Sequence, residues 1–380
     1  MVSVAMLGFV VLAILEVRKS RNFSFSDFIK NKAFSGLLLV FFAVVLSGLN
    51  SGNLDAWLHE VKIKLPFLIL PVAFFVLRNQ LDQKTHKWIH LAFIVVALVS
   101  TFHVFGNFLM DREAIVASLS RGKSIPTPLD HIHYSIMIAY AVVCSVILAI
   151  IEKEKRMKWL LFVVAFYLFG FVHFLSVRTG LVIAYAGIFI VLAWFVISRR
   201  KYLIGISALA LMIAIPFIAF HTIESFNKKI GYMVWDLTQY RKGKGNSYSD
   251  SERLMSYKIS LDLIKEKPLL GHGIGDLRPI MTQKHLELYG QKDKYIYPHN
   301  QYLYILACMG ILGALIFFFG LFTPLIYAPQ RNIFLISIFA LMLLSFLVEN
   351  TIQRAVITGF FLFFILINTC YRMNAEIEKP

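Results

Sequence analysis

Residues 133–151 read HYSIMIAYAVVCSVILAII, an apolar run that contains no Asp, Glu, Lys or Arg. A helix that crosses a bilayer uses about 20 apolar residues, so this run predicts a membrane-spanning helix. Ten further apolar runs are bounded by charged or turn-forming residues: 1–17, 33–48, 65–78, 89–110, 158–176, 179–198, 202–220, 299–327, 332–348 and 355–371. The sequence therefore predicts an all-α, polytopic transmembrane helical bundle of about eleven spans, within a range of about ten to twelve.

The composition of the whole chain agrees with a membrane protein. Of its 380 residues, 58% are hydrophobic and 16% are charged, whereas soluble domains carry about a quarter of charged residues. The three cysteines, Cys144, Cys308 and Cys370, lie in apolar runs, where thiols behave as small hydrophobic side chains. This composition excludes an ordinary water-soluble domain, and the cysteines indicate neither a disulfide framework nor a metal cluster.

The net charge of +16 would suggest nucleic-acid binding in a soluble protein, but here most of it follows the predicted topology. Lys and Arg are concentrated in the short loops on one side of the bundle, for example at 199–201, and such loops stay in the cytoplasm. This predicts an external N-terminus and a cytoplasmic C-terminus. The first run has no positively charged segment before it, so we interpret it as a span and not as a signal peptide. An external N-terminus leaves open a further span before Met1.

One long hydrophilic segment divides the chain. Residues 221–298 form an external loop that contains short helices, residues 1–220 hold spans one to eight, and residues 299–380 hold spans nine to eleven and a cytoplasmic tail. Residues 241–247 in the loop are rich in Gly and Lys and would form either a lid or a solvated segment.

The same loop contains a predicted amphipathic helix over residues 252–267. Its apolar residues recur at helical spacing, N-cap candidates lie at 249–251, and Pro268 ends it; the apolar residues are Leu254, Tyr257, Leu261 and Ile264. Such a helix would lie at the membrane surface or pack on the bundle.

Three basic residues on the predicted external side are candidates for chemistry. Arg178 lies in a tight turn between two spans, Arg253 begins the loop helix, and His299 lies where the loop re-enters the membrane. A cation at a helix start opposes the helix dipole, which for Arg253 indicates an anionic ligand or the neighbouring Glu252. Arg178 alone is equally compatible with interfacial anchoring. A lone histidine is commonly structural, although neutral imidazole accepts a proton near physiological pH.

The order of these residues resembles the O-antigen ligase family. The shared features are Ser-Val-Arg-Thr-Gly at 176–180, an arginine opening the loop helix, Lys-Pro-Leu-Leu-Gly-His-Gly-Ile-Gly at 267–275, and Pro-His-Asn-Gln-Tyr-Leu at 298–303 before Gly-Ile-Leu-Gly at 310–313. Each piece alone is unspecific, but all of them occur in order and on the expected sides of the membrane. The resemblance is good over residues 158–328 and weak elsewhere.

The resemblance implies a glycosyltransferase of the bacterial inner membrane that acts at the periplasmic face. It would transfer an undecaprenyl-diphosphate-linked glycan to an acceptor hydroxyl, which for the ligases belongs to lipid A-core. The implied catalytic residues are Arg178, Arg253 and His299. Guanidinium groups suit a diphosphate leaving group because they form paired, charge-assisted hydrogen bonds without losing a proton. His299 would orient or deprotonate the attacking hydroxyl, and in-line attack would invert the anomeric centre.

A second set of residues on the same side could contact substrate: Asn300, His131, Asp130, Gly273, Gly275, His272, Glu349 and Arg354. Glycines permit positive φ and can expose N–H groups to an anion, although the Gly-rich link would serve equally well as a hinge. Glu349 and Arg354 flank a short external turn and would alternatively form an ion pair with each other.

A metal-dependent reaction is the competing mechanism. It would need a carboxylate pair such as Asp-x-Asp, and the nearest match is Asp250-Ser251-Glu252. Asp130-His131-Ile132-His133 alternates ligand types, but at a helix start its two rings would diverge. We therefore predict that the chain needs no metal and no other cofactor.

The expected partners are a lipid-linked glycan donor, lipid A-core or another glycan acceptor, and membrane lipids, without nucleic acid. Two related activities remain open: a polymerase that extends one lipid-linked glycan with another, and attachment of such glycans to protein hydroxyls. From another class, a transporter or flippase for an anionic solute would have repeated halves and charges near the midplane. No repeat is visible here, and the basic candidates gather at the outer edge.

Overall fold

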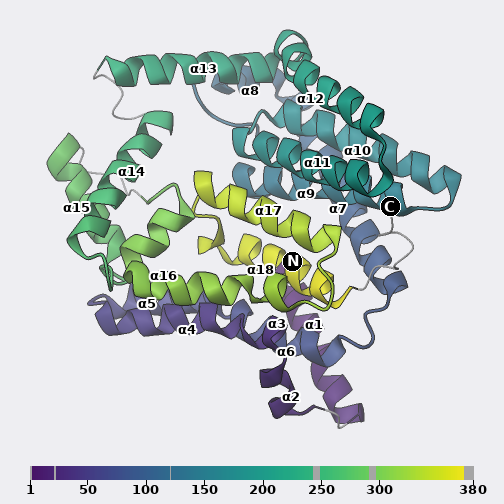
Figure 1. Cartoon of the computed structure of the whole chain (residues 1–380). Coiled ribbons are helices and arrows are strands. Elements are labelled where there is room, and N and C mark those ends of the chain that lie inside the picture. Colours follow the sequence, from purple (N-terminus) through teal and green to yellow (C-terminus); the bar gives the residue numbers. More distant parts are fainter. Residues whose placement is uncertain (1, 21–22, 120, 243–248, 291–296, 372–380) are drawn as a thin grey trace. The chain divides into compact units, whose positions relative to one another are not determined.

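The computed structural model describes residues 2–20, 23–119, 121–242, 249–290 and 297–371, and the regular elements among them are all helical (Figure 1). The chain divides into two compact units, each built from segments far apart in sequence. Unit 1 has its described residues within Met1–Asp82, Glu252–Leu335 and Phe346–Arg372. Unit 2 has its described residues within Gln83–Ser251 and Ile336–Ser345. The predicted boundaries at residues 220 and 298 remain predictions.

Unit 1 contains the N-terminal helices and most of the C-terminal ones. They are α1 (Val2–Ser20), α2 (Phe25–Lys30), α3 (Lys32–Ser35), α4 (Leu38–Leu46), η1 (Ser47–Asn50), α5 (Leu54–Lys64), α6 (Pro66–Leu77), α15 (Leu277–Tyr289), α16 (Gln301–Tyr327), η2 (Thr351–Gln353) and α18 (Ala355–Cys370). Most of α14 (Ser249–Glu266) and both ends of α17 (Ile333–Val348) also belong to it.

Helix α16 packs on α3 and α4, and α6 packs on α1 and α18. Small residues permit the first contact, because a Cβ atom added at Gly36 would collide with Thr323 and one added at Gly320 would collide with Leu39. Close approach at small residues is typical of helix packing in membranes.

Helix α16 is interrupted at Gly310, whose φ of 61° and ψ of −169° are not helical. Residues 268–273 occupy the break: the N–H of Ile311 donates to the carbonyl of Pro268 (2.8 Å), and that of Gly273 donates to Cys308 (2.8 Å). Only glycine fits at 310, because a Cβ atom there would overlap the backbone of Leu269. The Gly-rich link is therefore part of the packed structure of unit 1.

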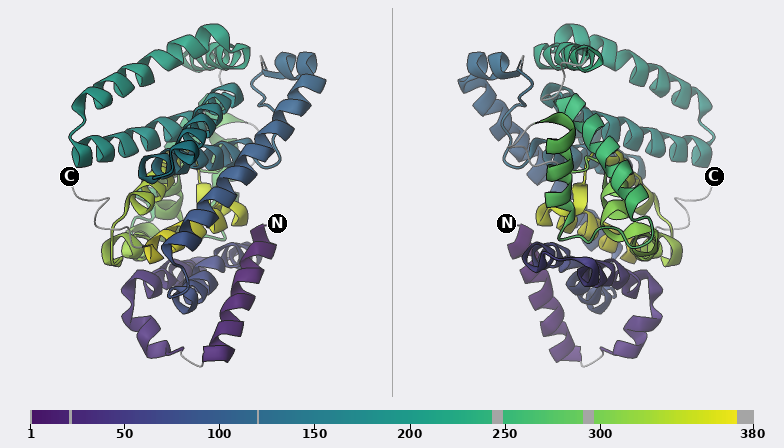
Figure 2. Two further views of the ribbon diagram at one scale, coloured as in Figure 1. Left: turned by 90° about the vertical axis from the view of Figure 1, so that its right-hand side faces the viewer. Right: turned by 90° about the vertical axis from the view of Figure 1, so that its left-hand side faces the viewer.

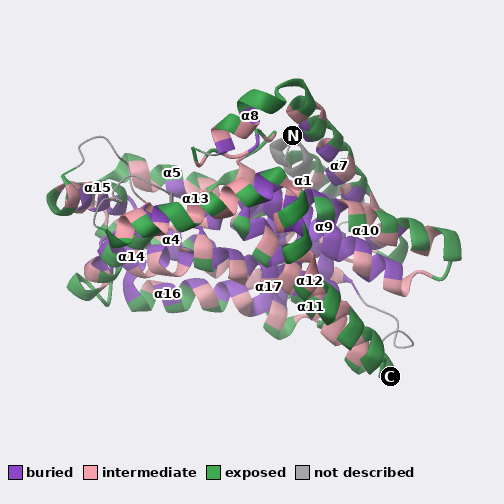
Figure 3. Ribbon diagram, turned by 90° about the horizontal axis from the view of Figure 1, so that it is seen from above, coloured by how far each residue is buried: buried purple, intermediate pink, exposed green. Residues whose placement is uncertain are grey.

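Unit 2 is organised around α9. Its helices are α7 (Gln83–Met110), α8 (Arg112–Leu119), α9 (His131–Ile151), α10 (Lys155–Leu175), α11 (Arg178–Arg199), α12 (Tyr202–Thr222) and α13 (Glu224–Arg241). Helix α9 packs against α7, α10 and α11 and is buried over most of its length (Figure 3). Figure 2 shows α7 as one continuous rod with α8 at its upper end.

The described part of the chain has seven helical segments long and apolar enough to cross a membrane. They are Lys32–Asn50, Gln83–Met110, His131–Ile151, Lys155–Leu175, Arg178–Arg199, Tyr202–Thr222 and Gln301–Tyr327. Helices α17 and α18 are shorter apolar helices. The prediction of an all-helical, multi-pass membrane protein is confirmed, whereas the number of about eleven spans remains a prediction.

The predicted loop helix forms, and the structure shows which of its residues are buried. Helix α14 ends at Glu266, shortly before Pro268, and starts at Ser249, so the expected N-cap residues belong to its first turn. Leu254 and Leu261 are 40% and 47% exposed, whereas the residues buried completely are Met255, Ile259, Leu263, Ser251, Ser256 and Ser260. The serines tolerate burial because they can bond their own helix, as Ser260 does to the carbonyl of Ser256 (2.6 Å).

Two further helices, α13 and α15, lie within the segment predicted as a loop. Most of the predicted lid or solvated segment, at 243–247, lies outside the described residues.

Candidate functional site

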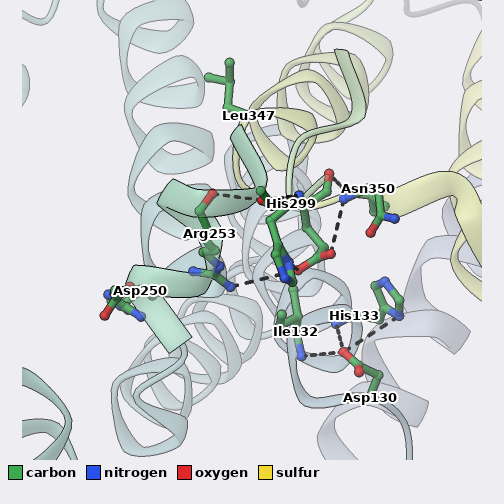
Figure 4. Close-up of polar contacts among 12 residues, drawn as sticks. Asp130, Ile132, His133, Asp250, Arg253, His299, Leu347 and Asn350 are labelled. Atoms are coloured by element: carbon green, nitrogen blue, oxygen red, sulfur yellow. Dashed lines mark hydrogen bonds and ion pairs between the residues drawn. The ribbon is translucent and has the colours of Figure 1, made fainter. Parts of the chain in front are cut away.

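In unit 1, a histidine and a carboxylate meet at the external end predicted for the bundle. His299 directly precedes Asn300, the N-cap of α16, whose side-chain oxygen accepts from the N–H of Leu303 (3.0 Å). Glu349 directly follows α17, and its Oε2 lies 3.2 Å from Nδ1 of His299 (Figure 4). The side chains of His299 and Glu349 are 27% and 11% exposed, so the pair is mostly withdrawn from water.

The electrostatics of this pair indicate which ring nitrogen of His299 carries the proton. Burial opposes ionisation of Glu349, but the hydrogen bond and charge of His299 and the charge of Arg253 together lower the pKa of this carboxyl. Glu349 is then an ionised acceptor, and Nδ1 of His299 is the donor. In neutral imidazole the other nitrogen, Nε2, carries the lone pair that can take a proton. The arrangement can therefore act as a general base oriented by a carboxylate.

Arg253 completes this cluster from α14. Its Nη2 lies 3.9 Å from Oε2 of Glu349, and its side chain is 19% exposed. A guanidinium group has five N–H donors in a planar fork. The long contact with Glu349 leaves N–H donors that could bond an anionic ligand.

Helix α14 also holds the backbone of His299 in place. The hydroxyl of Tyr257 donates to the carbonyls of His299 (2.9 Å) and Leu347 (3.2 Å), and Ser256 Oγ accepts from the N–H of His299 (3.3 Å). The amide of Asn300 also donates to the carbonyl of Leu347 (3.0 Å). Burial raises the pKa of Tyr257, which keeps its hydroxyl protonated and able to donate. Tyr257 thus joins the two chain segments that carry His299 and Glu349.

The turn after Glu349 rests on a buried lysine. Lys64, the last residue of α5, donates to the carbonyl of Ile352 (2.6 Å) and to Gln353 Oε1 (3.0 Å), and lies 3.7 Å from Glu60. Gln301 accepts from the N–H of Ile352 (3.1 Å). Burial lowers the pKa of Lys64, against the charge of Glu60. These contacts fix η2 and, with it, the end of the segment that carries Glu349.

Arg178 belongs to unit 2 and has separate partners there. It is the first residue of α11, and its Nη1 lies 2.6 Å from Oδ1 of Asp250. The side chain of Asp250 is 10% exposed and that of Arg178 is 42% exposed. Asp250 is itself placed by its N–H, which donates to Asp236 (2.7 Å). Arg178 therefore faces water partly and has a buried counterion.

Lys229 on α13 adds a second cation to this region of unit 2. Its Nζ donates to the carbonyl of Gly122 (2.8 Å) and to Ser124 Oγ (3.3 Å). Burial, followed by the positive charge of Arg178, lowers the pKa of Lys229 to about 8, although Asp250 opposes the shift. Arg178 and Lys229 thus interact with each other and with Asp250 in a partly buried place.

The Gly-rich link has structural contacts for its N–H groups. His272 donates to Ala307 (2.9 Å), Gly273 to Cys308 (2.8 Å), and Gly275 to Ser51 Oγ (3.1 Å). The ring of His272 lies 2.9 Å from the carbonyl of Leu263. These contacts favour a structural role for Gly273, Gly275 and His272 over binding of an anion.

Asp130 caps a helix. Its Oδ1 accepts from the N–H groups of Ile132 (3.0 Å) and His133 (3.4 Å) at the start of α9 (Figure 4), as an N-cap residue does. His131 is the first residue of α9, and Arg354 directly precedes α18. Asp130 thus has a sufficient structural explanation, and substrate contacts of His131 and Arg354 remain predictions.

Sequence reasoning missed four contributors to these clusters: Asp250, Lys229, Tyr257 and Lys64. Asp250 was considered only as an N-cap candidate and as part of an acidic pair, and Tyr257 only as an apolar residue of the loop helix. Glu349 was expected to pair with Arg354 or with substrate, and the structure places it against His299 and Arg253. The signal for Tyr257 was its helical spacing of four residues from Arg253. The sequence holds no comparable signal for Lys229.

The apolar helices are those of a multi-pass membrane protein, and the polar clusters include a candidate catalytic histidine. Residues 163–318 match the family model described as O-antigen ligase. This match over part of the chain supports membership in the O-antigen ligase family. The matched range includes Arg178, Asp250, Arg253 and His299, whereas Glu349 lies beyond it. A comparison with curated proteins finds no match.

Proposed function

We propose that this protein transfers a glycan from an undecaprenyl-diphosphate-linked donor to an acceptor hydroxyl at the periplasmic face of the bacterial inner membrane. The acceptor that we propose is the sugar of lipid A-core, which makes the protein an O-antigen ligase. The observation that carries the proposal is the 3.2 Å contact between His299 Nδ1 and Glu349 Oε2 beside Arg253. It supplies a base and a cation next to each other in a chain of this family.

In the proposed reaction, His299 is the general base. The acceptor oxygen attacks the anomeric carbon of the donor sugar, and its proton passes to Nε2 of His299. The bond between that carbon and the diphosphate oxygen breaks, and undecaprenyl diphosphate leaves with the electron pair. Glu349 stabilises the resulting imidazolium, and displacement from the opposite side inverts the anomeric centre. A positioned base of this kind contributes about 10²- to 10⁴-fold in rate.

Arg253 and Arg178 are the proposed ligands of the diphosphate. Both are paired with carboxylates in the absence of substrate, Arg253 with Glu349 and Arg178 with Asp250. Their cationic groups can compensate the charge that develops on the leaving group. The proposal is metal-independent, and transfer should therefore survive EDTA. Loss of transfer in EDTA, restored by a divalent ion, would contradict this part.

The central test uses purified full-length protein in nanodiscs with undecaprenyl-diphosphate-linked O-antigen and lipid A-core. The variant His299→Ala should lower the transfer rate by at least about 10²-fold. The control is His221→Ala at the end of α12, because His221 is a histidine that has no part in the cluster. Full activity of His299→Ala would refute the general-base role.

Four outcomes distinguish the ligase from the alternative activities. Lipopolysaccharide from a deletion strain should lack all long chains while the lipid-linked polymer accumulates. Core that carries a single repeat would instead indicate a polymerase, and loss of glycoproteins would indicate transfer to protein. A protein that only moves an anionic solute across liposomes, without glycan transfer in detergent, would support the transporter or flippase.

A further inference from the structure

Unit 2 contains a pocket that includes none of the candidate catalytic residues. It has a volume of about 960 Å³ and lies between the end of α7, α8 and the start of α13. Its lining residues are Leu109, Met110, Asp111, Arg112, Glu113, Ala114, Val116, Ala117, Glu224 and Lys228. We refer to it as the α8–α13 pocket. Its volume is in the range of sites that bind small molecules.

Acidic and basic side chains both line the α8–α13 pocket. Arg112 Nη2 lies 3.4 Å from Glu224 Oε2, and these side chains are 64% and 47% exposed. An exposed ion pair contributes little to stability, so a ligand can replace it at small cost. Carboxylates accept hydrogen bonds, whereas guanidinium and ammonium groups donate them. A lining with both kinds of group suits a ligand that has many hydroxyls, each of which donates and accepts.

Two aromatic residues lie on the side of α13 that carries Lys228. Tyr232 and Trp235 follow Lys228 by four and seven residues and therefore lie on the same side of the helix. Their ring centroids are 5.7 Å apart, and Trp235 is 42% exposed. The Tyr232 ring packs over Gly122, where a Cβ atom would collide with it. Flat rings with a polar edge offer an apolar surface to the C–H face of a sugar ring.

Exposed apolar residues occur at one end of the pocket. Leu109 is 60% exposed and Met110 is 84% exposed, both in the last turn of α7. Helix α7 has the length and hydropathy of a membrane span, so its last turn is expected near the lipid boundary. The ligand of such a place should combine a hydroxyl-rich group with a lipid.

We propose that the α8–α13 pocket, with Tyr232 and Trp235, binds the oligosaccharide of the lipid-linked acceptor. This inference rests on the proposed function and names the place where the acceptor sugar is held. The carboxylates and cations bond the hydroxyls, and the rings of α13 contact the faces of the sugars. The acyl chains of the acceptor remain in the membrane beside Leu109 and Met110.

The test measures binding separately from transfer. Deacylated lipid A-core oligosaccharide is titrated calorimetrically into full-length protein in nanodiscs. Trp235→Ala and Glu224→Gln should each weaken binding by about tenfold, as expected for the loss of one good contact. The catalytically impaired His299→Ala protein should bind the oligosaccharide like the wild type. Trp159→Ala is the matched control, because Trp159 is also an exposed tryptophan of unit 2.

Kinetics provide the second measurement. Both pocket variants should raise the KM for lipid A-core about tenfold, with kcat and the donor KM changed less than about twofold. Unchanged oligosaccharide binding in both variants would overturn the inference, even with transfer intact. A raised donor KM with an unchanged acceptor KM would also overturn it. Wild-type protein that binds the oligosaccharide through Trp235 without any transfer would instead refute the ligase function and leave the binding site standing.

Discussion

In unit 2, Oδ1 of Asp250 lies 2.6 Å from Nη1 of Arg178, and the carboxylate is the more deeply buried partner. A charge-assisted bond of this length holds the guanidinium in one orientation. Under the proposed function, the donor diphosphate would therefore compete with Asp250 for Arg178. The resting ion pair therefore both orients this arginine and limits its availability.

The competition predicts the effect of Asp250→Asn. The donor KM should fall about three- to tenfold, because the apparent affinity scales with the fraction of protein in which Arg178 is available. Transfer rates measured at increasing concentrations of lipid-linked donor test this. Asp262→Asn is a suitable control, because Asp262 pairs with an exposed lysine of the same helix. A donor KM that rises in Asp250→Asn would show that orientation outweighs competition.

Glu349→Gln should lower kcat about 10²- to 10⁴-fold. The amide can donate to Nδ1 of His299 and so favour the tautomer that has its proton on Nε2, where the base is needed. Single-turnover assays under saturating donor and acceptor isolate this step. Glu349→Asp retains a carboxylate and should keep more activity than the glutamine variant; equal activities would argue against the orienting role.

The lowered pKa of Glu349 also has a consequence for stability. Because this carboxyl ionises more easily in the folded protein, its contribution is fully present above its ordinary pKa of 4.5. It is lost as the pH falls through the lower pKa of the folded state. Thermal unfolding in nanodiscs should therefore show acid destabilisation that is weaker in Glu349→Gln. Identical pH dependence in both proteins would contradict it.

Tyr257→Phe should lower kcat about tenfold while leaving both KM values unchanged. The substitution removes the hydroxyl that donates to the carbonyls of His299 and Leu347, so the distance between His299 and Glu349 is less well held. Stability should fall by only about 1 kcal/mol, the net value of a hydrogen bond. Tyr202→Phe, at an exposed tyrosine of α12, serves as control. Changed KM values with kcat intact would place Tyr257 in substrate binding.

The lowered pKa of Lys229 predicts that donor binding and protein stability change in opposite directions as the pH rises. Its pKa of about 8 means that it loses its positive charge as the pH rises through this value, so donor affinity should weaken there. Lys229→Arg stays charged and should flatten this dependence. Between pH 8 and its ordinary pKa of 10.5, the unfolded chain binds more protons than the folded one, so stability should rise with pH. Lys229→Gln should abolish that rise, and its persistence would exclude Lys229 as the cause.

The helices were predictable from sequence because lipid imposes one strong rule on the chain. A spanning segment must satisfy its backbone internally and remain apolar, which gave the limits of α9 and α11 to within a few residues. The face of α14 was not predictable from hydropathy. The buried serines Ser256 and Ser260 bond backbone carbonyls of the helix, so they can share the buried side with Met255, Ile259 and Leu263.

The candidate site was predictable only in its chemistry. Arg178, Arg253 and His299 have residue types suited to a diphosphate and a hydroxyl, and their order along the chain matches a family. Their partners come from distant segments: Glu349 lies fifty residues after His299, and its sequence neighbourhood suggested Arg354 instead. Such pairings depend on how helices α14, α16 and α17 pack against one another. The hydrophobic periodicity of the sequence does not reveal this packing.

The break of α16 at Gly310 has a mechanical consequence. Backbone hydrogen bonds on both sides of the break join α16 to residues 268–273, directly after α14. In the middle of α14, the hydroxyl of Tyr257 donates to the carbonyl of His299, the residue before the N-cap of α16. Two separated attachments prevent one helix from sliding along the other, so α14 and α16 share a fixed register. Under the proposed function, a pull on Arg253 by the donor diphosphate should therefore be transmitted to His299 as the movement of a single rigid body.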